Sequence, residues 1–212
     1  MRYASDVAAL ARKDLLIELR AKETVPAMLL FVVSALTIFH FAVPTGAGHK
    51  VTLGLLWTAL VFTALLGLTR AFVPEREQGL FDALVLAPCD RSAIWLAKAL
   101  SVFAFLALAE AVALPAFGLF FYSLGWRVVA AVLLADVGIC AVGTLTGAMA
   151  VAGKARELIL PLLFLPLSIP IVVGGVGASI VSNGKYFAFL ALYDAVFVTL
   201  SWASFEYVVA EA

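Results

Sequence analysis

The sequence predicts an all-α polytopic membrane protein with six transmembrane helices, an N-terminal interfacial helix and a short helix between the second and third spans. Hydrophobic residues make up 65% of the 212 residues and charged residues only 13%, whereas soluble domains average roughly half apolar and a quarter charged. Six apolar runs provide the roughly 20 residues that a membrane helix requires. The expected spans are 25–43, 51–73, 93–121, 128–152, 158–180 and 187–208. Their short connections leave no room for a soluble catalytic domain, so we expect no enzymatic activity in this chain.

Residues 1–24 precede the first span and carry basic and acidic side chains in alternation. Ala11, Leu15 and Leu19 fall in one helical row, while Leu10 falls off it, so the predicted helix is imperfectly amphipathic. The pattern favours a helix that lies in the membrane interface and leads into the first span. An ordinary charged tail is the alternative.

A polar segment, residues 74–88, separates the second span from the third. Pro74 suits the first turn of a helix, Glu75 and Glu77 favour the positive end of the helix dipole, and Pro88 prevents continuation. One face of this short helix is apolar and consists of Leu80, Phe81, Leu84 and Val85. Such a face can lie in the membrane surface or in a groove on a partner protein. A solvated turn is the alternative.

The distribution of Lys and Arg predicts the orientation in the membrane. With the N-terminus inside, the outer connections hold only Lys50, Arg127 and Lys185, and the inner segments hold the other eleven of the fourteen basic residues. Because basic loops are retained on the cytoplasmic side, both termini and residues 74–88 are predicted to be cytoplasmic. The formal net charge of zero gives no reason to expect a nucleic-acid partner.

Three carboxylic acids fall inside predicted spans: Glu110 in the third, Asp136 in the fourth and Asp194 in the sixth. Each costs about 2.5 to 3.5 kcal/mol on insertion scales, and no basic residue lies at a matching depth. These side chains are therefore expected to be protonated, paired or facing water. A polar transport path and simple hydrogen bonding between helices both remain open.

The fifth span contains Pro161, Pro166 and Pro170. Each proline removes a backbone donor and crowds the preceding turn, so a straight helix is not expected. In lipid the freed carbonyls need other partners, which predicts a span packed inside the protein or lining a wet cavity. A bent, movable gate helix and a statically kinked helix are equally compatible with this pattern.

The run from Gly147 to Ala155 differs from a phosphate-binding loop in two ways. Five residues, not four, separate Gly147 from Gly153, and Ala155 stands where Ser or Thr would follow Lys154. We therefore expect no nucleotide site in this chain. Any ATPase that powers transport must be another polypeptide.

The chain offers few candidate metal or cofactor ligands. Cys89 and Cys140 lack metal-ligand spacing, and no disulfide is expected between them. His40 and His49 lie near the predicted outer end of the first span and in the following loop. Histidines in this position could contact haem, or they could be ordinary interfacial residues. We expect no metal and no cofactor bound by this chain.

Two sequence motifs together resemble those of a known family. The first begins Phe72-x-x-Glu75-x-Glu77-x-Gly79 and continues through Leu84 and Pro88 to Lys98; the second is Leu165-Pro166-Leu167-Ser168-Ile169-Pro170. Trp57 and Arg70 in the second span also match the pattern of that family. The chain resembles the CcmB family of cytochrome c maturation over essentially its whole length.

The resemblance implies an ABC exporter-type permease in the bacterial cytoplasmic (inner) membrane. Its expected partners are a cytoplasmic ATPase (CcmA-like), two membrane subunits (CcmC-like and CcmD-like) and, indirectly, the periplasmic haem chaperone CcmE. The family is described either as a haem exporter or as the part that couples ATP hydrolysis to release of haem-loaded CcmE from CcmC. Haem is then the cargo of the complex. The tryptophan-rich haem-handling motif of CcmC is absent here.

Carried onto this chain, the resemblance implies an elbow helix in residues 1–24 and a permease domain in residues 25–212, with the ATPase-coupling element in residues 74–88. The implied coupling residues are Glu75, Arg76, Glu77, Gly79, Phe81, Leu84 and Val85. The candidate transport path or gate consists of Glu110, Asp136, Pro161, Pro166 and Pro170. A permease for glycan, lipid or drug export is the alternative, and a stand-alone proton-coupled carrier is a weaker one because no internal repeat is evident.

Overall fold

The computed structural model describes residues 2–44, 46–71, 90–152 and 156–210, and these ranges contain seven α-helices and no strand. The helices are α1 (Arg2–Ala21), α2 (Thr24–Ala42), α3 (His49–Ala71), α6 (Arg91–Phe120), α7 (Trp126–Ala152), α8 (Arg156–Ile180) and α9 (Lys185–Ala210). The six helices after α1 are each long and apolar enough to cross a membrane. The predicted fold class is confirmed, and each predicted span border lies within two residues of the observed helix end.

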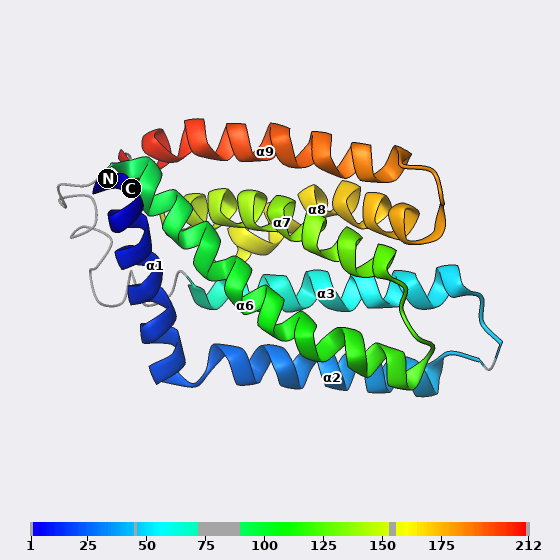
Figure 1. The fold of residues 1–212 in the computed structure, drawn as a ribbon. Coiled ribbons are helices and arrows are strands. Elements are labelled where there is room, and N and C mark those ends of the chain that lie inside the picture. Colours follow the sequence, from blue (N-terminus) through cyan, green and yellow to red (C-terminus); the bar gives the residue numbers. More distant parts are fainter. Residues whose placement is uncertain (1, 45, 72–89, 153–155, 211–212) are drawn as a thin grey trace.

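The six long helices run side by side, and α1 lies across one end of the bundle (Figure 1). This end, which we call the α1 end, also holds the end of α3, the beginning of α6 and the C-terminus. A helix that crosses the bundle axis has the orientation expected of a helix in the membrane interface.

The buried face of α1 differs from the predicted apolar row. Leu19, the last residue of the predicted apolar row with Ala11 and Leu15, is 55% exposed. Leu10, expected off that row, packs beside Val7 against α6. The position of α6 therefore decides which side of α1 is covered by protein, and the interfacial placement of α1 stays a prediction.

Helix α7 occupies the middle of the bundle, packed against α3, α6, α8 and α9. It is the most buried of the spans, whereas α2 and α9 are the least buried. Gly143 has no side chain to keep Leu68 of α3 away from the α7 backbone, and Gly138 allows the same close approach by Asp194 of α9. Small residues permit this kind of contact between membrane helices.

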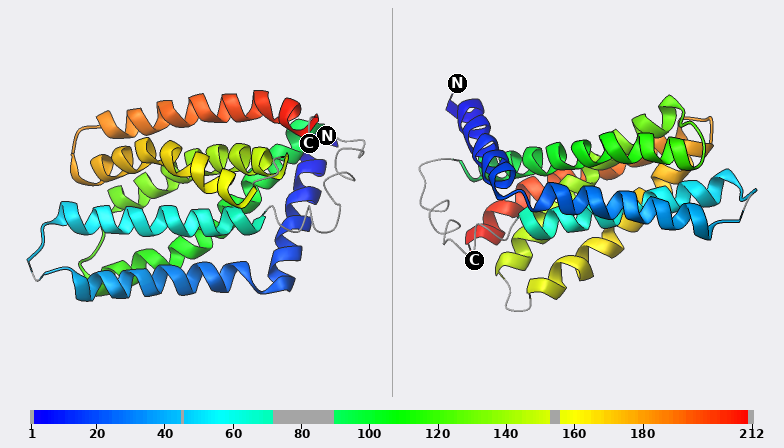
Figure 2. Two further views of the ribbon diagram at one scale, coloured as in Figure 1. Left: turned by 180° about the vertical axis from the view of Figure 1, so that it is seen from behind. Right: turned by 90° about the horizontal axis from the view of Figure 1, so that it is seen from below.

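Helix α8 remains helical through all three of its prolines, and its first half leans away from the bundle (Figure 2). The carbonyls on either side of Pro166 receive hydroxyl donors. Ser168 Oγ donates to Leu165 O at 2.8 Å, and Tyr193 Oη of α9 donates to Leu167 O at 2.6 Å. The first bond lies within α8, and the second ties α8 to α9 beside the prolines.

Candidate functional site

Helix α1 lies across the end of α3 and the beginning of α6, where the described chain stops at Ala71 and resumes at Asp90 (Figure 1). The predicted coupling residues fall between these two points and lie outside the described residues; they are Glu75, Arg76, Glu77, Gly79, Phe81, Leu84 and Val85. The structure does describe the helices that hold both ends of that segment. Their contacts therefore define the candidate site.

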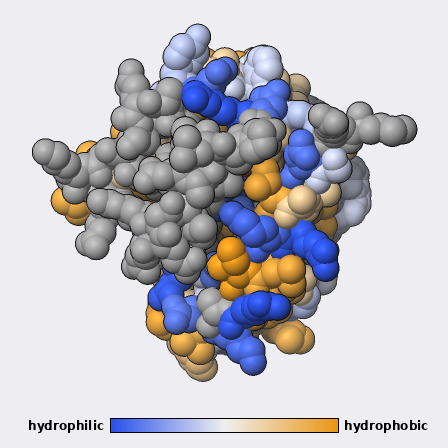
Figure 3. Space-filling model, turned by 90° about the vertical axis from the view of Figure 1, so that its left-hand side faces the viewer, coloured by the Kyte–Doolittle hydropathy of each residue, from blue (hydrophilic) through white to orange (hydrophobic). Residues whose placement is uncertain are grey.

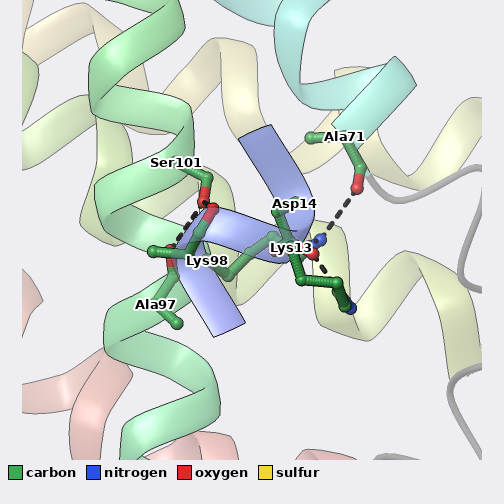
Figure 4. Close-up of polar contacts among 7 residues, drawn as sticks. Lys13, Asp14, Ala71, Ala97, Lys98 and Ser101 are labelled. Atoms are coloured by element: carbon green, nitrogen blue, oxygen red, sulfur yellow. Dashed lines mark hydrogen bonds and ion pairs between the residues drawn. The ribbon is translucent and has the colours of Figure 1, made fainter. Parts of the chain in front are cut away.

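Lys98 of α6 connects all three helices through its ammonium group (Figure 4). Its Nζ lies 3.2 Å from Asp14 Oδ2 of α1 and donates to Ala71 O at the end of α3 at 3.0 Å. The last carbonyls of a helix have no partner within the helix, and the helix dipole favours a cation there. We call Asp14, Ala71 and Lys98 the lysine clamp. It fixes the end of α3 against α1 and α6.

The lysine clamp is nearly shielded from solvent, since Lys98 is only 4% exposed. A buried ammonium group is tolerated where a carboxylate and further acceptors surround it. Lys13 Nζ also lies 2.9 Å from Asp14 Oδ1, so two cations flank this carboxylate. Next to the clamp, Ser101 Oγ lies 2.9 Å from Ala97 O and 3.4 Å from Ala11 O, which adds a contact between α6 and α1 (Figure 4).

The first turn of α6 is capped and tied to two other helices. Asp90 is the N-cap residue, and its carboxylate accepts from Ser92 N at 2.9 Å and from Ser92 Oγ at 2.8 Å. These bonds hold the pKa of Asp90 below its usual value. Ser92 Oγ also reaches Tyr3 Oη of α1 at 3.2 Å, and Arg91 Nη1 donates to Glu206 O of α9 at 3.2 Å. Both ends of the segment are therefore anchored.

Hydrophilic side chains gather on the face of the α1 end (Figure 3). Arg70 and Glu23 form one exposed ion pair at this end, with Nη1 3.0 Å from Oε2. Exposed pairs contribute at most about 1 kcal/mol. Hydrophilic side chains at the α1 end are typical of a surface that lies outside the membrane core. The buried lysine clamp, in contrast, joins α1, α3 and α6 to one another.

The three predicted acids lie within the bundle on three different helices, and we call them the acid centre. Glu110, Asp136 and Asp194 are 6%, 1% and 5% exposed. Glu110 lies on α6 and Asp136 on α7, two helices that pack against each other. Asp194 Oδ1 packs against Gly138 of α7. Among the described residues, no donor meets five of the six carboxyl oxygens.

The prolines of α8 do not gather at the acid centre. Pro166 lies on the exposed side of the helix, and Pro161 and Pro170 are half-buried. Ile171, which follows Pro170, is fully buried and packs beside Gly138. The structure thus buries Glu110, Asp136 and Asp194 inside the bundle and places α8 next to Gly138 of α7 through Ile171.

Comparison with known proteins gives the family. The model of the CcmB protein family matches residues 5–210. Heme exporter protein B of Paracoccus denitrificans is 31% identical over 176 residues, which is 80% of each chain. Heme exporter protein B of Bradyrhizobium diazoefficiens is 31% identical over 178 residues, covering 82% of this chain and 80% of the relative. The chain belongs to the CcmB family. The resemblance predicted from the two motifs is confirmed.

Within this CcmB chain, the quoted motif residues take distinct positions. Lys98, the last residue of the first motif, is the centre of the lysine clamp. Trp57 is 1% exposed, and its ring packs against Gly175 of α8. The second motif lies in α8, where Ser168 and Leu165 are hydrogen-bonded to each other. Arg70 pairs with Glu23 at the α1 end.

The two histidines of this CcmB chain lie at the end of the bundle opposite to α1, and both are exposed. His49 stacks on Tyr122 with ring centroids 4.2 Å apart, and His40 lies 5.5 Å from Phe120. In the described ranges, no group of three His, Cys, Asp or Glu side chains is arranged to hold a metal ion. Cys140 is a buried free thiol there.

Sequence reasoning did not find the partnership of Asp14 with Lys98. Asp14 is one of several acids in a charged helix, and Lys98 was noticed only as the end of a motif. A lysine several residues inside an apolar span is the one signal that could have pointed to a buried ion pair.

Proposed function

We propose that this CcmB-family chain is the membrane permease subunit of an ABC-type complex for haem export and cytochrome c maturation. The relatives, which are named as heme exporter protein B, and the six candidate spans support this proposal. The chain acts without catalysis of its own, and a separate CcmA-like subunit hydrolyses ATP. CcmC-like and CcmD-like membrane subunits complete the complex, and a CcmE-like chaperone receives haem on the outer side.

The lysine clamp is the observation that carries the mechanism. The coupling segment, residues 74–88, docks on the ATPase and is displaced when that partner closes on ATP. Displacement at Ala71 and Asp90 passes directly to α3 and α6, and Lys98 joins these two helices to α1. The three helices then shift as one body, which is the usual way in which packed elements transmit a change.

In this arrangement the α1 end faces the cytoplasm of a bacterial inner membrane. The eleven basic residues expected on that side support the assignment. Helix α1 lies in the interface as an elbow, with Leu19 toward lipid. Both termini are then cytoplasmic, and the histidine end of the bundle faces the periplasm.

The acid centre affects whether haem itself could cross the bundle. Haem carries two propionate groups, and the helices of the acid centre offer no basic side chain at its depth to pair with them. This favours a subunit that transmits motion and thereby releases the haem-loaded chaperone. Glu110, Asp136 and the proline helix with Pro161, Pro166 and Pro170 then form a gate between helix positions, and not a seat for haem.

Replacement of Lys98 tests the proposal in cells that lack the native subunit. Lys98→Met should reduce cytochrome c assembly at least about tenfold, corresponding to about 1.4 kcal/mol of coupling, while the complex still forms and ATPase subunits still hydrolyse ATP. Cytochrome c is measured by haem staining, and Glu23→Gln is the matched control because its ion pair is exposed. Normal cytochrome c levels with Lys98→Met would contradict the clamp mechanism.

Co-purification from native membranes in mild detergent separates the alternatives. Recovery of an ATPase together with a tryptophan-rich haem-handling protein supports the maturation complex. An ATPase without haem proteins points to a permease for glycan, lipid or drug export. Recovery of neither points to a proton-coupled carrier.

A further inference from the structure

Helix α1 turns its acidic side chains toward the protein. The buried side of the helix carries Val7, Asp14 and Glu18, which follow one another at spacings of seven and four residues and therefore share one face. Asp14 pairs with Lys98 of α6, and Glu18 is only 7% exposed. The two acids in the second half of α1 are thus withdrawn from its outer surface.

The opposite side of α1 combines positive charge with exposed apolar side chains. It carries Arg12, Leu16, Leu19 and Arg20, all exposed, which we call the outer stripe. Arg12 and Leu16 are about one turn apart, as are Leu16 and Arg20, so these side chains lie along one side of the helix. Leu16 and Leu19 are 42% and 55% exposed, and none of the ion pairs among the described residues involves Arg12 or Arg20. The stripe therefore presents two unpaired guanidinium groups beside two exposed leucines.

The position of the outer stripe relative to the bilayer follows from the course of the chain. Helix α1 ends at Ala21, and Lys22 adopts a left-handed φ of 53° and donates its amide to Glu18 O at 3.2 Å. A left-handed residue with this hydrogen bond is a common way to end a helix. Helix α2, the first span, begins directly afterwards at Thr24. This short connection places the outer stripe at the level of the lipid headgroups.

The headgroup layer satisfies both kinds of side chain in the outer stripe. Leucines of an interfacial helix bury their apolar surface among the acyl chains, while arginines keep their charged ends at the headgroups. A guanidinium group binds phosphate through paired hydrogen bonds. A zwitterionic headgroup offsets this attraction with a cation of its own, whereas an anionic headgroup does not. Charge complementarity therefore favours anionic lipids.

We propose that the outer stripe of α1 is a binding site for anionic phospholipids in the membrane leaflet at the α1 end. Arg12 and Arg20 bind the phosphate groups, and Leu16 and Leu19 insert among the acyl chains. The site goes beyond the permease function, although it rests on the proposed interfacial position of α1.

This site connects the lipid composition of the membrane to the lysine clamp. Lipid holds the outer side of α1, and Asp14 on the inner side holds Lys98 and, through it, Ala71 at the end of α3. Anionic lipid therefore stabilises the position of α1 against which α3 and α6 are fixed.

Native mass spectrometry of the purified full chain in detergent tests the proposal without any partner subunit. The probes are phosphatidylglycerol, which is anionic, and phosphatidylcholine, which is zwitterionic and is used with the same acyl chains. We expect the native chain to bind phosphatidylglycerol more tightly. The double variant Arg12→Gln, Arg20→Gln should weaken that binding at least about tenfold, since each basic residue near an anionic surface contributes about fivefold. Its affinity for phosphatidylcholine should change much less.

Two further double variants identify the cause of the effect. Lys50→Gln, Lys185→Gln removes the same charge from exposed positions at the opposite end of the bundle and should weaken phosphatidylglycerol binding much less. Arg12→Lys, Arg20→Lys keeps both charges and should retain most of the affinity. Because both arginines are exposed, the variants are expected to fold, which circular dichroism checks.

Three outcomes overturn the proposal. Equal weakening by the glutamine variants at the two ends shows a general attraction to charge and no site on α1. Displacement of the lipid by soluble glycerol phosphate shows a site for free phosphate. Unchanged lipid binding in Arg12→Gln, Arg20→Gln excludes the site, and a simultaneous loss of the co-purified ATPase would assign the stripe to a protein contact. Because the lipid measurement requires neither ATPase nor haem, its failure leaves the permease proposal standing, and the converse also holds.

Discussion

Lys98 Nζ lies 3.2 Å from Asp14 Oδ2 and 3.0 Å from Ala71 O, so one ammonium group holds three helices together. The pair joins residues that are far apart in the sequence and come from a charged helix and an apolar span. The contact gives α1 a structural task beyond resting on a membrane surface. It links α1 directly to the end of α3 at Ala71 and to α6 at Lys98.

Removal of both partners of this pair should destabilise the protein by less than the sum of the two single removals. Lys98→Met leaves Asp14 without one of its cations and should cost about 3 kcal/mol of unfolding free energy. The double variant Asp14→Asn, Lys98→Met should cost less than the sum of the single changes. Denaturant unfolding in detergent measures the cycle. Strict additivity would show that the two side chains do not interact.

The coupling face in residues 74–88 should be needed for function and not for membrane insertion. In the double variant Phe81→Asp, Leu84→Asp, we expect normal insertion but loss of cytochrome c assembly, because charges would disrupt an apolar contact with the ATPase. Haem staining reads assembly, and membrane fractionation reads insertion. Normal cytochrome c levels would exclude a coupling role for this face.

A side chain at position 138 should destabilise the folded protein. Gly138→Ala would drive a methyl group against Asp194 Oδ1, and overpacking of this kind costs about 1 to 3 kcal/mol. Gly54→Ala in α3 is the matched control, since nothing lies near its added methyl group. That change should stabilise the protein by about 0.5 to 1 kcal/mol. Thermal unfolding in detergent compares the two, and equal effects would contradict the close approach of Asp194.

The N-terminal cap of α6 should make a pH-dependent contribution to the free energy of unfolding. The pKa of Asp90 is lowered in the folded state, so its stabilising effect is fully present above the unfolded value and is lost as the pH falls through the folded value. Asp90→Asn keeps a capping oxygen but removes the titration. The difference in stability between native protein and this variant should shrink on acidification. A difference that is constant down to strongly acidic pH would refute the effect.

The hydroxyl of Tyr193 should support the proline-rich helix. Tyr193→Phe removes the donor to Leu167 O and should destabilise the protein by about 0.5 to 1.5 kcal/mol. Tyr207→Phe serves as the control because that ring is 75% exposed near the end of α9. Thermal unfolding would show no difference between the two variants if the bond to α8 contributed nothing.

Local sequence patterns were sufficient for the spans, because the length and apolar character of a membrane helix are properties of one segment. Glu110 and Asp136 could be recognised one by one from the cost of a carboxyl group in lipid. The close approach of Asp194 to Gly138 could not, because it depends on how α9 packs against α7. The exposed Leu19 and the pair of Asp14 with Lys98 have the same origin, since both are decided by the position of α6 relative to α1.

The anchored ends at Ala71 and Asp90 also have an entropic consequence. Bringing the two ends of a chain segment together costs conformational entropy that grows with the logarithm of its length. In this protein the contacts that hold the two ends in place offset that entropy cost. They are the lysine clamp at Ala71 and the α6 cap at Asp90. A partner that binds residues 72–89 therefore does not have to supply it, and more of its binding energy remains to move the helices.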